Sequence, residues 1–195
     1  YSLNTLMNLV YFEDFPVVLQ KAARLNLHTN FVSDFLREKG YEIVVFDSGT
    51  GDSNFQYADR FITPSPAPEN DQAYLNSFEV LLIQTTSLSV LLQPANNNLD
   101  AIGNQHVIAI NRDLDLRRAR VFSAFSHLPD YSDDAKPQFL FAHIYTPHIP
   151  FLYDENGDGL KYTSNMNLNW FDVPSDDYRF AYTNQIKKVN ELILA

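Results

Sequence analysis

His143 and His148 are the residues whose type and placement in this sequence could do chemistry. Residues 139–151 read FLFAHIYTPHIPF and hold two of the chain's five histidines. An imidazole titrates near neutral pH, so it can donate to a developing oxyanion or protonate a leaving alkoxide. Pro147 and Pro150 restrict the backbone around His148, and a restricted loop holds a side chain at little entropic cost. These local features are equally consistent with a functional role for the two histidines and with simple packing in the core.

The apolar run before His148 predicts the element that positions it. Residues 139–145 show no polar/apolar alternation, which is typical of a strand covered on both faces in a parallel sheet. His148 would then lie just past the carboxyl end of that strand. Because ligands of open α/β sheets bind at this edge, the sequence predicts a binding site there.

Helical and strand-like segments alternate along the rest of the chain. Apolar residues at helical spacing precede Gly40, and the strand-like YEIVVF follows at 41–46; these apolar residues are Phe31, Val32, Phe35 and Leu36. A second short strand is expected at 58–62, and helices are expected within 72–92 and 104–128.

The last segment, 175–195, is also expected to be a helix. Ser175 is its expected N-cap. Its expected apolar stripe consists of Tyr178, Tyr182, Ile186, Val189 and Ile193. We expect one α/β domain over residues 1–195, with a mostly parallel central sheet and helices on both faces.

Two turn-like segments carry oxygen ligands. DENGDG, at 154–159, has Asp154, Asn156 and Asp158 at the first, third and fifth positions of a calcium loop and Gly159 at the sixth. Asn165 stands at the twelfth position, where such a loop carries a bidentate Glu, so a plain polar turn is favoured over a cation site. DSGTGDSN, at 47–54, lacks the lysine of a phosphate loop and is expected to be a turn at the sheet edge, where its hydroxyls could face a substrate.

Arg117, Arg118 and Arg120 cluster on one predicted helix, where a solvated helix face is favoured over an anion site. The remaining histidines, at 28, 106 and 127, stand alone and are expected to be core or surface residues.

Composition excludes several classes of function. The formal net charge of −10 argues against binding nucleic acid, because affinity for a phosphate backbone comes from Lys and Arg. The absence of cysteine excludes disulfides, thiolate nucleophiles and thiolate metal sites. No run approaches the roughly 18 apolar residues that cross a bilayer, so we expect this chain to be soluble.

Two motifs together resemble the central part of a sulfatase-like domain of the alkaline phosphatase superfamily. The first is the strand ending at His143 with the H-x-P-F element at 148–151, and the second is the Y-x-x-Q-I element at 182–186. The opening residues YSLNTLMNLVY also resemble the helix that follows the nucleophile in that family. The group most similar is the membrane-anchored bacterial one that includes lipoteichoic acid synthases and phosphoethanolamine transferases.

The resemblance implies an alkaline-phosphatase-like fold and a metal-dependent hydrolase or phosphotransferase. Its substrate would be a small anionic sulfate or phosphate ester, or a lipid or glycan that carries one. The resemblance also implies that His148 acts catalytically and binds substrate, and that His143 lines the pocket, binds a second metal or bonds within the sheet.

The same resemblance implies that the metal ligands lie outside residues 1–195. The first metal-binding strand and the nucleophile would precede Tyr1, and the late Asp-His pair would follow Ala195. We therefore expect no metal site in this segment, whereas the intact, extracytoplasmic and membrane-anchored bacterial parent would use zinc, manganese, magnesium or calcium. The isolated segment would be inactive. The alternative is a non-catalytic α/β module that binds a glycan or a protein through its 11 Tyr and 15 Phe residues.

Overall fold

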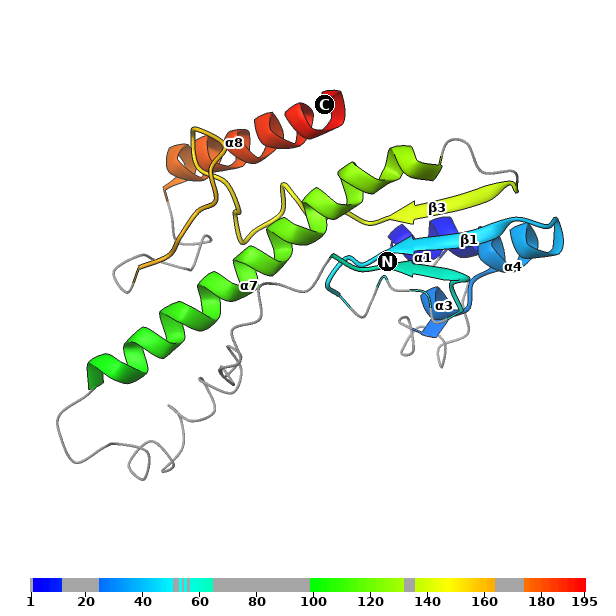
Figure 1. Ribbon diagram of the computed structural model, residues 1–195, viewed down its shortest axis with the longest axis horizontal. Helices are drawn as coiled ribbons and strands as arrows, with labels where there is room; N and C mark the ends of the chain where they lie inside the picture. The colour runs from blue at the N-terminus through cyan, green and yellow to red at the C-terminus, as the bar shows by residue number, and fades with distance from the viewer. Residues whose placement is uncertain are drawn as a thin grey trace. The chain divides into compact units, whose positions relative to one another are not determined.

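In the part of the chain that the structure describes, three parallel strands form a sheet; the computed structural model is shown in Figure 1. The structure describes residues 2–11, 25–50, 53, 55, 57–64, 99–131, 136–163 and 174–195. The chain divides into two compact units, Tyr1–Ser65 with Ala119–Tyr145, and Pro66–Arg118 with Thr146–Ala195. The single domain expected over 1–195 stays a prediction.

The sheet lies in the first unit and has the order β2-β1-β3. Its strands are β1 (Glu42–Phe46), β2 (Arg60–Ile62) and β3 (Gln138–Ala142). Phe46 is in register with Ile62 on one side and with Ala142 on the other, so the three carboxyl ends meet at one edge. The two strands expected at 41–46 and 58–62 are confirmed. The expected parallel sheet is also confirmed, because β1 pairs in parallel with both β2 and β3.

Helices cover both faces of this sheet, as expected. On one face Ile43 and Val45 pack with Met7 of α1 (Ser2–Asn8), Leu27 of α3 (Leu25–His28) and Phe55. On the other face Val44 and Phe46 pack with Ala124 of α7 (Leu99–His127) and with the 3-10 helix Leu128–Tyr131. The molecule is therefore a mixed α/β protein with a doubly covered parallel sheet.

β3 differs in part from the strand expected at 139–145. Phe139 and Phe141 pack on one face of the sheet and Leu140 and Ala142 on the other, which explains the lack of alternation. All five residues of β3 are nevertheless only half-buried, because β3 is an outer strand among the three described. The fully buried central strand is β1.

α4 (Phe31–Glu38) confirms the helix expected before Gly40. The Asn30 side chain caps it by accepting from the backbone N–H of Ser33 at 2.9 Å, and Gly40 ends it at φ +85°. Val32 and Leu36 pack on the core, whereas Phe31 (53% exposed) and Phe35 (45% exposed) stack on each other at the surface. Half of the predicted apolar stripe is therefore not core.

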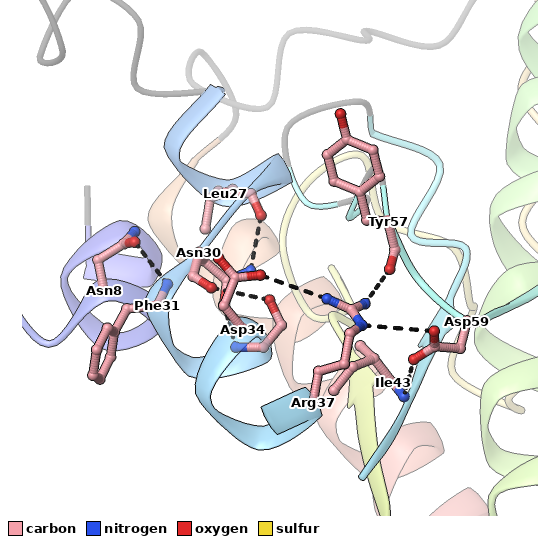
Figure 2. Close-up of polar contacts among 10 residues, drawn as sticks. Asn8, Leu27, Asn30, Phe31, Asp34, Arg37, Ile43, Tyr57 and Asp59 are labelled. Carbon is pink, nitrogen blue, oxygen red and sulfur yellow. Dashed lines mark hydrogen bonds and ion pairs between the residues drawn. The ribbon is translucent and has the colours of Figure 1, made fainter. Parts of the chain in front are cut away.

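Arg37 ties α4 to the sheet (Figure 2). Its guanidinium pairs with Asp34 on the same helix and with Asp59 ahead of β2, and it donates to the Tyr57 carbonyl. The other oxygen of Asp59 accepts the Ile43 N–H at 2.8 Å. One carboxylate thus links the helix, β1 and the start of β2.

The remaining helices are α7 and α8 (Ser175–Leu194), both at places where the sequence predicts a helix. Ser175 is not the N-cap of α8: Pro174 holds that position, and no side chain caps the helix. The helix expected within 72–92 lies outside the described residues. In the part of the chain that the structure describes, no helix has the length and apolar character needed to cross a membrane.

Candidate functional site

Polar residues follow β1 directly at the carboxyl edge of the sheet. The segment after Phe46 reads Asp47, Ser48, Gly49 and Thr50, and His143 follows β3 at the next register position after the Phe46–Ala142 pair. Neighbouring strands lie about 4.8 Å apart, so the backbones of Asp47 and His143 are close. The hydroxyl-rich turn thus lies at the edge where the sequence predicts it.

Three hydroxyls in this turn bond to one another. Ser48 Oγ lies 3.1 Å from Thr50 Oγ1 and 2.8 Å from Ser53 Oγ, and the distance between Thr50 Oγ1 and Ser53 Oγ is 2.9 Å. Ser53 is buried, while Ser48 and Thr50 are half-exposed. The buried hydroxyl fixes the positions of the two that approach the solvent.

An ion pair closes the start of the turn. Arg120 Nε donates to Asp47 Oδ2 at 2.9 Å, and Asp47 Oδ1 accepts the Gly49 N–H at 2.8 Å. The favoured prediction of a solvated arginine face is therefore wrong for Arg120, whose side chain is 24% exposed. The prediction is wrong for Arg118 too, because its side chain is only 14% exposed and pairs with Asp115. Arg117 pairs with Asp113, and its side chain is 36% exposed. Each arginine finds an aspartate, which shields it from solvent.

His143 is half-buried just past the end of β3. Its ring lies 6.4 Å from the ring of Phe141 and 4.8 Å from that of Tyr145, and its Nδ1 is buried without a hydrogen-bond partner among the described residues. Burial lowers the pKa of His143 below 6.5, because the charged imidazolium loses hydration there. The folded chain therefore favours a neutral ring at this position.

His148 lies in the second unit and is exposed. Its Nδ1 is 2.7 Å from the carbonyl oxygen of Ile149, which can only accept, so Nδ1 carries a proton. His143 and His148 belong to different units, and the roles predicted for them stay predictions.

The residues after His148 are held by a buried amide of α8. Gln185 is 0% exposed, and its Oε1 accepts the N–H groups of Leu152 at 2.9 Å and Tyr153 at 3.0 Å. Its Nε2 donates to the carbonyls of Tyr153 at 2.7 Å and Ala181 at 3.0 Å. The buried side chains of α8 are therefore polar ones, Asn184 and Gln185, whereas Tyr182, Ile186 and Ile193 of the predicted stripe are exposed.

Phe151 fills the space between this loop and the start of α8. The side chain is fully buried, with its ring 5.3 Å from that of Tyr178 and 6.5 Å from that of Tyr182, both in edge contact. The last residue of the H-x-P-F element is thus an anchor for the loop that carries His148.

Two residues of α7 hold the loop from its other end. Arg118 Nη1 donates to the carbonyls of Leu152 at 3.1 Å and Leu160 at 3.0 Å. The Asn111 amide donates to the Tyr162 carbonyl at 2.9 Å and accepts the Tyr162 N–H at 2.8 Å. Side chains therefore replace regular secondary structure in fixing residues 151–162.

The DENGDG segment has the geometry of a polar turn. Asp154 Oδ1 accepts the N–H groups of Asn156 and Asp158, both at 2.9 Å, and Gly157 has φ +80°. Tyr153 and Gly159 form an antiparallel bridge that closes the turn. One oxygen of Asp154 therefore orders the backbone of the turn.

A pocket that the sequence gives no reason to expect lies beside β2. Its volume is about 480 Å³, and it is lined by β2 and Thr63 on one side and by His127, Asp130 and Tyr131 on the other. Arg60 lies over the Tyr131 ring at 4.7 Å and near Glu42 Oε2 at 3.9 Å. The guanidinium is thus already engaged by an aromatic ring and a carboxylate.

The described residues contain no group of three His, Asp or Glu side chains placed to hold a metal ion. His127 Nδ1 donates to the Ser123 carbonyl at 2.8 Å, which accounts for this lone histidine as a surface residue. Comparison with family models, curated proteins and solved structures finds no match to this chain.

Sequence reasoning missed Asp47, Arg120 and Arg118 as organising residues. Asp47 alone carried a signal, because it is a carboxylate placed directly after a buried strand. Gln185 stands in the Y-x-x-Q-I element on which the resemblance rests, but its buried position could not be read from that element.

Proposed function

We propose that this chain is the central part of a sulfatase-like, metal-dependent hydrolase or phosphotransferase that acts on a sulfate or phosphate ester. The observation that carries the proposal is the presentation of His148. Its imidazole is exposed, while the residues that follow are anchored by Phe151 and by three hydrogen bonds of Gln185 to Leu152 and Tyr153. An exposed reactive group on a fixed backbone is what positioning of a substrate requires.

The hydrogen bond to Ile149 limits what His148 can do. With Nδ1–H donating to the carbonyl, a neutral ring offers a lone pair at Nε2 and acts as a base. A ring protonated at Nε2 donates to an ester oxygen or passes that proton to the leaving alkoxide. His148 therefore serves as the acid in its cationic form and returns to the neutral form after the proton is transferred.

His143 contributes differently in this proposal. Its ring is favoured in the neutral state by burial, because desolvation lowers its pKa. In this proposal the neutral His143 ring lines the substrate pocket. It offers one N–H donor and one lone-pair nitrogen there, and it adds no charge.

The metal belongs to the intact protein in this proposal. The donor groups of the described residues do not fit a metal site, since no three His, Asp or Glu side chains converge. No chemical step is therefore assigned to a metal here. The alkaline-phosphatase-like fold, and a home outside the cytoplasm on a membrane-anchored bacterial parent, are parts of the same proposal.

The test uses a longer polypeptide that includes the native segments on both sides of residues 1–195. We expect it to turn over an aryl sulfate or an aryl phosphate in the presence of divalent metal, whereas residues 1–195 alone turn over neither. His148→Ala is expected to lower kcat/KM roughly 100-fold or more, the usual contribution of a positioned acid or base.

His127→Ala is the matched control, because His127 is also an exposed histidine whose Nδ1 donates to a backbone carbonyl. The kcat/KM of His127→Ala should equal that of the longer polypeptide without a substitution. Parental rates in His148→Ala would remove His148 from the mechanism. The absence of any turnover by the longer polypeptide would favour the non-catalytic glycan- or protein-binding module.

A further inference from the structure

Arg120 offers an unused pair of nitrogens at the carboxyl edge of β1. Its Nε is bound to Asp47 Oδ2 at 2.9 Å, which orients the guanidinium. Nη1 and Nη2 have no hydrogen-bond partner in the part of the chain that the structure describes. A guanidinium has five N–H donors, so four remain for a ligand in a fixed fork.

Gly49 makes room for this guanidinium. A Cβ added at Gly49 would lie 2.7 Å from Arg120 Nη1 and 2.8 Å from Cζ, so the fork rests directly on the backbone of the turn. Gly49 also has φ +77°, a conformation that residues with side chains rarely adopt. The backbone and the ion pair together fix where the fork lies.

Hydroxyl groups lie in the same turn as Gly49. Ser48 Oγ and Thr50 Oγ1 are half-exposed, 3.1 Å apart, and both bond to the buried Ser53 hydroxyl. Ser48 Oγ also donates to the Thr50 carbonyl at 3.2 Å, so its proton would turn from that oxygen to a ligand oxygen on binding.

The backbone of His143 lies at the same edge, at the next position after the Phe46–Ala142 register pair. β1 connects to β2 on one side and lies beside β3 on the other, which makes the gap between β1 and β3 a topological switch point.

We propose that the carboxyl edge of β1 and β3 binds a tetrahedral oxyanion, either a phosphate or a sulfate group. The Arg120 fork is its principal donor, and the Ser48 and Thr50 hydroxyls take further oxygens. A guanidinium fork alone matches a planar carboxylate equally well; added hydroxyl donors favour a group with three or four oxygens. The Asp47 carboxylate does not oppose the anion strongly, because Arg120 and the Gly49 N–H already bind its oxygens.

This site lies within the first unit and does not depend on His148 or on the catalytic proposal. The test is titration of residues 1–195 with inorganic phosphate, sulfate, phenyl phosphate and acetate, followed by calorimetry and by amide NMR shifts. We expect the tetrahedral anions to bind more tightly than acetate and to shift the amides of Ser48, Gly49, Thr50 and His143. If inorganic phosphate binds more tightly than phenyl phosphate, the ligand is a free anion. If phenyl phosphate binds more tightly, the ligand is an ester.

Arg120→Gln is expected to raise the Kd for phosphate roughly tenfold or more, because a charge-assisted pair of hydrogen bonds is lost. Arg117→Gln is the matched control on the same helix and should leave the Kd unchanged, since Arg117 pairs with Asp113 instead. Arg120→Lys keeps the charge beside Asp47 without the fork, so it serves if Arg120→Gln does not fold, and the same weakening is expected.

The proposal is overturned if the parent chain binds no tetrahedral anion. It is also overturned if folded Arg120→Lys binds phosphate as tightly as the parent, or if the shifted amides lie elsewhere, as around Arg60 and His127.

Discussion

The imidazole of His143 holds a proton less readily in the folded chain than in the unfolded one. Its ring is half-buried, its Nδ1 has no partner among the described residues, and burial lowers its pKa below 6.5. Below pH 6.5 the unfolded state therefore binds more protons than the folded state at this residue. Linkage then makes the free energy of unfolding rise with pH through this window, so stability is lost as the pH falls.

We therefore expect the free energy of unfolding to decline between pH 7.5 and pH 5.5, and to decline less in His143→Gln. Urea unfolding at several pH values measures this difference. A decline equally steep in His143→Gln would mean that other groups set the acid sensitivity.

At the scale of single residues, the sequence predicted positions better than partners. The edge position of the Ser48–Thr50 turn follows from the end of β1, which local patterns reveal. His148 was expected just past the end of its strand, but β3 ends at Ala142, and His148 lies in the second unit. The Asp47–Arg120 pair could not be predicted, because its members are 73 residues apart and meet only through the sheet and α7. Clustered arginines look solvated when their distant aspartates are unknown.

α8 is a helix whose buried side chains, Asn184 and Gln185, are polar. The N–H groups of Leu152 and Tyr153 and the Tyr153 carbonyl lie outside the three-stranded sheet, so they need partners, and Gln185 supplies them. An apolar residue at 185 would leave these groups buried and unpaired. The helix therefore stabilises the loop that carries His148 through one amide and one aromatic cluster.

Gln185→Leu is expected to lower the free energy of unfolding by about 3 kcal/mol, because several buried backbone groups lose their partners. Chemical denaturation measures this. Asn190→Leu, which changes an exposed amide of the same helix, should shift stability by no more than about 0.5 kcal/mol. Equal effects of the two variants would show that the Gln185 hydrogen bonds contribute little.

The sequence predicted that α8 exists but not which face it buries. Tyr182, Ile186 and Ile193 recur at helical spacing, so the apolar stripe was the expected core. In the structure these side chains are exposed, while Asn184 and Gln185 are buried. Periodicity reports where apolar side chains gather, and it contains no information about a neighbouring loop that requires a polar partner.

At the scale of the whole molecule, β1 is the element on which the first unit is built. Residues Ile43 to Val45 are completely buried, Ile43 and Val45 face one layer of helices, and Val44 faces the other. The apolar run at 42–46 made this strand predictable. The strand order was not, because β1 pairs with β3, whose residues come about a hundred positions later in the sequence.

This arrangement predicts where the backbone is most stable. β1 is hydrogen-bonded on both sides and packed on both faces, whereas β2 is short, with Arg60 and Phe61 exposed. Amides exchange with solvent by local opening, and opening β1 requires both sheet pairings and both helix layers to separate. Native-state hydrogen exchange on residues 1–195 should therefore show amides of β1 exchanging at least about tenfold more slowly than those of β2. If β1 and β2 exchange at the same rate, the first unit opens as one body and its core does not centre on β1.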